Sequence, residues 1–248
     1  MYFCVHLLQL NKMTQHNKKS FFKYIFKIAF IPFAFTLVML LVYILEIGME
    51  WDFAKAGIYP RKVDWLWTIF SYIFIHANWS HLFNNLLSFF LLSCCLFYFY
   101  RPVNIRIFIA LWFVSGMILW FIGRESRHVG ASGLIYAMAS FLLFSGLIRR
   151  HVPLIAISLV VTLIYGNMVW HIFPWTVNDP VSWEGHLAGL ITGLIIAIVF
   201  RNEGPQKPIK VWEEEEMEEE TDYWNEETSP HPSPKGEGVA GSENENEK

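Results

Sequence analysis

The sequence has little charge and few cysteines. Of its 248 residues only 17% are charged, whereas 54% are hydrophobic, and several long runs carry no charge. This composition excludes an ordinary soluble domain and indicates a multi-span membrane protein. The three cysteines are too few for a disulfide framework. Cys94 and Cys95 are adjacent, so on a helix they point to different faces and cannot hold a metal together.

Two other signals are missing. Residues 1–27 contain several lysines but lack the short apolar core and small-residue cleavage site of a signal peptide, so we expect a cytoplasmic lead-in. Translation could also begin at Met13. No inverted internal repeat is visible, which argues against a transporter without excluding one.

Long apolar segments predict six membrane-spanning helices. They cover roughly residues 28–49, 76–100, 103–123, 132–148, 152–171 and 184–200. Each is near the ~20 residues that cross a bilayer. The predicted fold class is therefore all-α, a polytopic six-helix transmembrane bundle over residues 28–200 with both termini on one side.

The basic residues predict the orientation in the cell membrane. With a cytoplasmic N-terminus, fourteen Lys and Arg residues lie inside and five outside, as the positive-inside rule requires. The first outer loop, residues 50–75, is rich in Trp and Tyr and should lie in the headgroup region. Residues 201–248 hold fifteen acidic and five basic residues, with a Glu run at 213–220, and predict a disordered acidic tail.

Polar side chains interrupt three of the apolar segments. An ionisable residue such as His186 inside a span usually faces a protein interior or a water-filled cavity, which makes it a candidate functional residue. His81 and Asn85 are four residues apart and share one helix face, near His76 and Asn78. For these side chains, hydrogen bonding that joins helices is an equally open interpretation.

The fourth segment opens with Gly130-Ala-Ser-Gly133. Ser132 at that position has an ordinary interpretation as a helix N-cap. The flanking glycines permit close backbone approach, and free N–H groups at a helix N-terminus can hold a developing oxyanion. Gly189 and Gly193 form a small-residue face that suits close packing against Gly133 and Ala137.

Counting helical steps tests whether these side chains meet. At about 1.5 Å per residue, Ser132 lies roughly 24 Å above Ile148 and His186 about 21 Å above Phe200. His81 lies about 28 Å above Tyr100, and tilt lowers this value. A hydroxyl, an imidazole and further donors at one depth are the parts of a nucleophilic site.

With these residues, the sequence resembles the rhomboid family of intramembrane serine proteases. The resemblance covers roughly residues 28–200. It rests on three separated motifs in order, and these are His76-(four residues)-His81-(three residues)-Asn85, Gly130-Ala-Ser-Gly133 and Gly185-His-Leu-Ala-Gly189.

The resemblance implies a dyad in which Ser132 is the nucleophile and His186 the general base, with no acidic third member. It implies that His81, Asn85 and the Ser132 amide form the oxyanion hole, and that the Tyr136 ring packs against the catalytic histidine. Gly130, Gly133 and Gly189 support this arrangement. One departure concerns the first outer loop, where the family's frequent Trp-Arg pair is replaced by Trp67-Thr68, so its anchoring is open. Glu184 should face away from His186 on a continuous helix.

The sequence therefore predicts an intramembrane serine endopeptidase that cleaves transmembrane segments of single-span or other membrane proteins near the extracytoplasmic side. Its partners are such substrates and the lipid bilayer; nothing calls for a cofactor, a metal or nucleic acid. One alternative is a non-catalytic rhomboid-like protein that binds client helices. Another is a transporter or metal site using His76, His81 and His186, although no carboxylate or thiol completes a ligand set.

Overall fold

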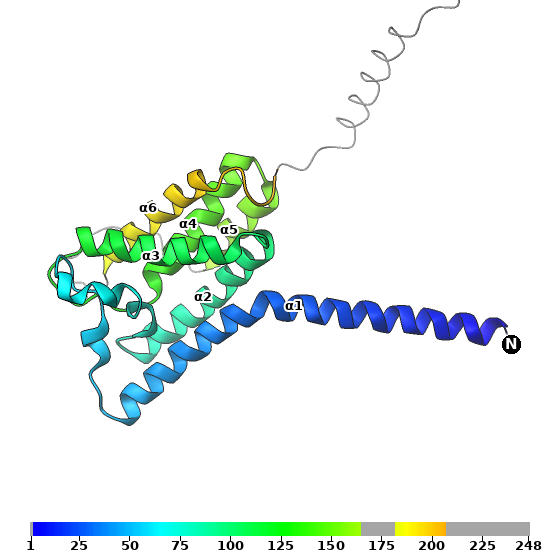
Figure 1. The fold of residues 1–248 in the computed structure, drawn as a ribbon, viewed down its shortest axis with the longest axis horizontal. Coiled ribbons are helices and arrows are strands. Elements are labelled where there is room, and N and C mark those ends of the chain that lie inside the picture. The colour runs from blue at the N-terminus through cyan, green and yellow to red at the C-terminus, as the bar shows by residue number, and fades with distance from the viewer. Residues whose placement is uncertain (1, 165–181, 207–248) are drawn as a thin grey trace, which may run out of the picture. The chain divides into compact units, whose positions relative to one another are not determined.

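In the computed structural model, which describes residues 2–164 and 182–206, the chain is built from helices (Figure 1). The longer helices are α1 (Tyr2–Gly48), α2 (Trp79–Phe99), α3 (Asn104–Ile122), α4 (Ser132–Arg149), α5 (Val152–Ile164) and α6 (Trp183–Val199). Between α1 and α2 lie three short 3-10 helices, which are η1 (Phe53–Ala56), η2 (Val63–Ile69) and η3 (Tyr72–Phe74). The described residues contain no strand, and one isolated bridge pairs Ile58 with His128.

Four described helices are long and apolar enough to cross a membrane. They are Phe22–Gly48 of α1, and α2, α3 and α4. The apolar helix α6 is shorter, with 17 residues. The predicted fifth span, 152–171, continues past residue 164 and so lies partly outside the described residues, as does the predicted acidic tail beyond residue 206. The fold class is thus a helical membrane bundle.

The helix bounds differ from the predicted segments at two places. Helix α1 is one continuous helix from Tyr2 to Gly48, so it runs through the predicted lead-in. Helix α2 begins at Trp79 rather than residue 76, because the Asn78 side chain caps it by accepting the His81 backbone N–H at 2.8 Å. His76 therefore precedes the helix instead of belonging to it.

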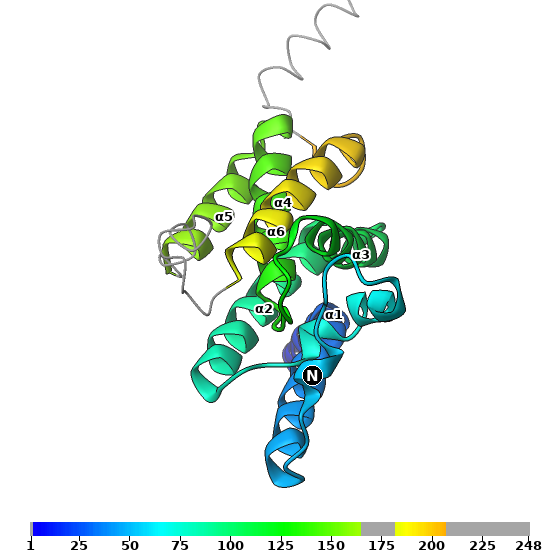
Figure 2. The same ribbon diagram turned by 90° about the vertical axis from the view of Figure 1, so that its left-hand side faces the viewer.

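Helix α4 lies at the centre of the bundle, with α6, α5 and α3 around it (Figures 1 and 2). Of its 18-residue apolar window, 67% is buried inside the protein, against 22–44% for the other three candidate spans. Large apolar side chains of α1, such as Phe30 and Phe33, stay exposed on the outside. An uncovered apolar surface of this kind suits contact with lipid. Among these four candidate spans of the described residues, α4 alone has most of its apolar window buried, so a site on α4 is shielded from lipid.

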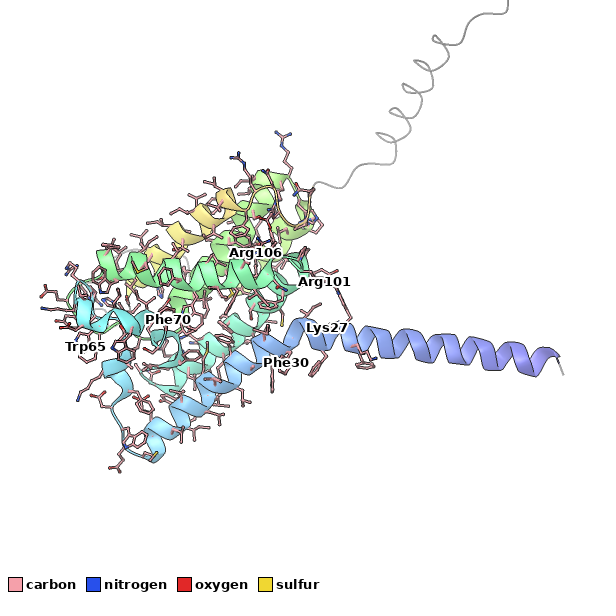
Figure 3. The ribbon with its side chains drawn as sticks, viewed as in Figure 1. Lys27, Phe30, Trp65, Phe70, Arg101 and Arg106 are labelled. Carbon is pink, nitrogen blue, oxygen red and sulfur yellow. The ribbon has the colours of Figure 1, made fainter. Side chains whose placement is uncertain are left out.

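The two ends of α3 differ chemically. Arg101 precedes α3 and holds its guanidinium 3.7 Å above the Tyr24 ring of α1. Figure 3 shows Lys27 and Arg106 at this end and Trp65 at the other. There the first loop joins α3 through the Trp120 indole N–H, which donates to the Lys62 carbonyl at 3.3 Å. Arg101 and Arg106 thus lie at the start of α3, and the aromatic first loop lies at its end.

Arg149 ties the last turn of α4 to the end of α6. The residue is only 6% exposed although its side chain is charged. The guanidinium donates to the Tyr100 hydroxyl at 2.6 Å and the Ser145 hydroxyl at 2.7 Å. It also donates to the backbone carbonyls of Phe200, Arg201 and Glu203. These carbonyls follow α6, so Arg149 acts as its C-terminal cap.

We expect Arg149→Met to lower the free energy of unfolding by about 3 kcal/mol, because it removes several hydrogen bonds of a buried cation and leaves the Arg201 and Glu203 carbonyls without that donor. Thermal unfolding of the purified protein in detergent measures this loss. Arg150→Met is the matched control, since Arg150 is exposed and its positive φ of 54° is equally unfavourable for both side chains. Equal destabilisation by the two substitutions would contradict the prediction.

Candidate functional site

The helices α4 and α6 touch backbone to backbone. A Cβ atom added at Gly189 would collide with the Gly133 carbonyl oxygen and lie 2.8 Å from the Tyr136 Cβ. One added at Gly193 would lie 2.5 Å from the Ala137 carbonyl oxygen. This is the close contact of small-residue faces expected for membrane helices. It brings the first turns of the two helices together.

His186 projects from the first turn of α6 onto α4. The residue is only 5% exposed, and its ring stacks on the Tyr136 ring with centroids 4.1 Å apart and planes inclined by 13°. Tyr136 lies one turn after Ser132, the half-buried first residue of α4. Beside them, a Cβ at Gly133 would lie 3.2 Å from the Gly185 carbonyl oxygen. The imidazole is therefore held against the helix that Ser132 begins.

The N-terminus of α4 has no side-chain cap. Its N-cap residue is Ala131, and Ser132 is already helical, so Ser132 does not serve as the N-cap. The N–H groups of a first turn lack partners within the helix. Just before it, Gly130 has a φ of +109°, a region that L-residues rarely adopt, and its N–H donates to the Tyr72 carbonyl at 3.0 Å. The chain thus enters α4 through a turn that requires glycine.

Gly130 also permits close approach to the polar face of α2. A Cβ there would lie 2.6 Å from the His81 Cε1, 2.7 Å from its Nε2 and 3.5 Å from the Asn85 Nδ2. Asn85 is 5% exposed, and its Nδ2 has no hydrogen-bond partner among the described residues. A buried donor without an acceptor is unusual in a native protein. The Asn85 Nδ2 therefore does not join helices by a hydrogen bond within the described residues.

His76 packs behind His81. The ring centroids are 5.1 Å apart, His76 is 2% exposed, and neither of its ring nitrogens forms a hydrogen bond within the described residues. Burial is the main cause that lowers the pKa of His76 to about 3, and the neighbouring His81 adds to it. The Phe74 carbonyl, which is near the ring without meeting hydrogen-bond geometry, opposes this shift. His76 is therefore neutral at physiological pH.

The first turn of α4 is thus flanked by His81 and Asn85 on α2 and by His186 on α6. A model of the Rhomboid domain family matches residues 63–203, which include all of these elements. The chain belongs to the rhomboid family. Helix α1 lies outside the matched residues, and the rhomboid domain identifies the chain as a multi-pass membrane protein.

Several curated proteins share this rhomboid region. An uncharacterized protein of Mycobacterium tuberculosis is 34% identical over 151 residues, covering 58% of this chain and 63% of that protein. Rhomboid-related protein 1 of Caenorhabditis elegans is 29% identical over 147 residues, covering 56% of this chain and 41% of that protein. An uncharacterized protein of Mycobacterium leprae is 32% identical over 152 residues, with 58% and 60% covered. The chain thus spans less than two thirds of these relatives.

Two arginines anchor the first loop, which connects α1 to α2. Neither belongs to the three sequence motifs. Arg127, before α4, donates to the Lys55 carbonyl at 2.6 Å and lies 3.9 Å above the Trp65 ring. Arg61 donates to the Gly123 carbonyl at 2.7 Å. Thr68 is buried and donates to the Trp65 carbonyl at 2.6 Å. These contacts hold the loop in this protein, in which Trp67-Thr68 replaces the Trp-Arg pair.

A second polar cluster lies at the start of α6. His128 Nδ1 is 2.6 Å from the Ser182 Oγ, and the Arg124 Nε is 3.6 Å from the buried Glu184 carboxylate. Glu184 thus pairs with the α3–α4 loop. His128 belongs to none of the three motifs, and the one feature of the sequence that points to it is an ionisable side chain four residues before Ser132. In the part of the chain that the structure describes, no three His, Cys, Asp or Glu residues form a metal-binding group.

Proposed function

We propose that this rhomboid is an intramembrane serine endopeptidase with Ser132 as nucleophile and His186 as general base. The supporting observation is the uncapped first turn of α4, which begins at Ser132 and lies between the donors of α2 and the imidazole of α6. Hydroxyl, base and free donors are the three requirements of nucleophilic acyl transfer.

In the proposed reaction, His186 takes the Ser132 proton while Oγ forms a bond to the peptide carbonyl carbon. The tetrahedral oxyanion receives hydrogen bonds from Asn85 Nδ2, the His81 ring and the Ser132 N–H. Breakage of the C–N bond releases the amine, which takes its proton from His186. Water then hydrolyses the acyl-enzyme by the same steps. No cofactor or metal is needed.

We further propose six spans with both termini in the cytoplasm and a site open to the extracytoplasmic side of the cell membrane. The basic end of α3 near Arg101 supports the cytoplasmic assignment, and the aromatic loop with Trp65 supports the opposite side. The substrates are then transmembrane segments of single-span or other membrane proteins. A substrate helix must unwind locally, because its carbonyls are otherwise hydrogen-bonded.

Labelling with a fluorophosphonate tests the nucleophile directly. The full-length protein in detergent should be labelled, and Ser132→Ala should abolish the label, since only an activated hydroxyl attacks the probe. Ser93→Ala is the matched control, because Ser93 is also a buried serine of a membrane helix and bonds only to carbonyls of its own helix. Folded protein without a label would favour the non-catalytic alternative that binds client helices.

Asn85→Ala should lower the cleavage rate of a single-span substrate in liposomes by roughly 10²–10³-fold, the usual effect of losing one oxyanion donor. Its stability should hardly change, because the Asn85 Nδ2 has no partner to lose. Asn84→Ala is the control, since the Asn84 side chain is exposed on the same helix. A large loss of thermal stability with unchanged cleavage would mean that Asn85 joins helices instead.

A further inference from the structure

His128 and Ser182 connect the two segments that lead into the proposed dyad. His128 lies four residues before Ser132, and Ser182 lies four residues before His186. The His128 Nδ1 and the Ser182 Oγ are 2.6 Å apart. Ser182 is also the N-cap of α6, and its Oγ accepts the Gly185 backbone N–H at 3.2 Å. One hydrogen bond thus joins the approach to α4 to the first turn of α6.

The direction of this hydrogen bond follows from its neighbours. The other ring nitrogen, Nε2, is 3.1 Å from the Arg124 carbonyl oxygen, which can only accept. Nε2 therefore carries the proton in the neutral ring, and Nδ1 accepts from the Ser182 hydroxyl. The Ser182 oxygen remains free to accept from Gly185. The hydrogen bonds therefore run from His128 Nε2–H to the Arg124 carbonyl, from the Ser182 hydroxyl to His128 Nδ1, and from the Gly185 N–H to the Ser182 oxygen.

The main chain of His128 is fixed as firmly as its ring. Its N–H and carbonyl both pair with Ile58 at 2.9 Å, which attaches it to the first outer loop. The residue is 2% exposed. Burial is the main cause that lowers its pKa, the Arg124 carbonyl and Glu184 oppose the shift, and the Arg124 charge adds to it. The ring is thus neutral and held in one position.

We propose that His128 is a positioning residue, which acts through Ser182 to set where α6 begins relative to α4. The distance between the Ser132 hydroxyl and the His186 imidazole then depends on the contact between His128 and Ser182. The ion pair of Arg124 with Glu184 supports the same junction, because it joins the same loop to the same helix turn. This role rests on the proposed dyad. A shift of about 1 Å in a reacting group can cost about 10²-fold in rate.

The test compares His128→Leu and Ser182→Ala with the wild-type protein in liposomes. Both should lower kcat by about 10–100-fold and leave KM within about threefold, since neither residue contacts the substrate. The double variant should be no slower than the slower single variant, because either substitution alone already removes the contact between His128 and Ser182. Fluorophosphonate labelling of Ser132 should slow in parallel, which reports the dyad without any substrate.

A conservative variant separates positioning from general stability. His128→Asn should recover most of the rate, because an asparagine Oδ1 can accept from Ser182 where Nδ1 did. Ser126→Ala is the control, since Ser126 Oγ lies 3.4 Å from the His128 Nε2 but does not connect the helices. If His128→Leu fails to fold, Ser182→Ala still decides, because it removes only one hydroxyl.

The outcomes are distinct. If cleavage depends on Ser132 but Ser182→Ala keeps kcat within twofold, the positioning role is overturned and the proposed function stands. Additive losses in the double variant, or no recovery with His128→Asn, also overturn it. If wild-type cleavage persists in Ser132→Ala, the proposed function fails, and the positioning role fails with it.

Discussion

Replacing His186 by alanine should lower the cleavage rate by roughly 10⁴–10⁶-fold, the range found when the base or nucleophile of a serine hydrolase is removed. A serine hydroxyl is a weak nucleophile, and it attacks a peptide carbonyl only when a base takes its proton. His186 is the ionisable group that stacks above the first turn of α4, 4.1 Å from the Tyr136 ring. Cleavage of a single-span substrate in liposomes measures the loss.

The same experiment separates the chemistry of the ring from its packing. Tyr136→Phe keeps the stacked ring and should retain nearly full activity. Tyr136→Ala frees the imidazole to move and should cost about 10²-fold, because the base is misplaced but present. Added imidazole should restore part of the rate to His186→Ala, where it can occupy the vacated space, and none to Ser132→Ala. Cleavage by His186→Ala within tenfold of the wild-type rate would exclude His186 as the base.

Residue spacing predicted the parts of the fold that depend on a single helix. The glycine spacing at Gly189 and Gly193 predicted the face of α6 that touches α4, because each helix repeats its faces every three to four residues. The i, i+4 spacing of His81 and Asn85 likewise predicted that they share one helix face, and in the structure that face lies beside Gly130. Predicted limits of α3, α4 and α6 agree with the structure within about one residue, since each of these apolar runs is a single helix.

Contacts between distant segments were not predictable in this way. The Arg149 guanidinium has its partners at Tyr100 and just after α6, 49–54 residues away. His128 and Ser182 are 54 residues apart. Neither partner shows a periodic or motif signal, so only the folded chain reveals that a buried cation or imidazole has found its acceptors.

Tertiary packing also decided between two interpretations that the sequence left open. A serine at the start of a helix is most often a cap, but here the chain turns through Gly130 and Ala131 before Ser132, so the serine falls inside the first turn. The positive φ of Gly130 allows this turn. Asn85 could have joined two helices, and instead its donor stays unpaired beside that turn. Both outcomes depend on backbone angles and neighbours that spacing alone does not specify.

The contact between α4 and α6 should also be sensitive to substitution, in stability as well as in activity. We expect Gly189→Ala to lower the free energy of unfolding by about 1–3 kcal/mol, the usual cost of overpacking, because its methyl group meets the Gly133 carbonyl and the Tyr136 Cβ. The clash involves backbone, which cannot move aside as a flexible side chain can. The helices must separate, and a displacement near 1 Å at His186 should lower cleavage by about 10²-fold.

Two other glycines provide the controls for this substitution. Gly48→Ala should change neither stability nor cleavage, because a Cβ at Gly48 meets nothing within 4 Å. Gly193→Ala should destabilise the protein about as much as Gly189→Ala, since its Cβ would lie 2.5 Å from the Ala137 carbonyl oxygen. It should cost less activity, because Gly193 lies one turn farther from His186.

Thermal unfolding in detergent and cleavage in liposomes measure the two effects separately. Equal activity losses at Gly189 and Gly193 would show that the rate follows overall stability, whereas a larger loss at Gly189 means that it follows the local separation of α4 and α6.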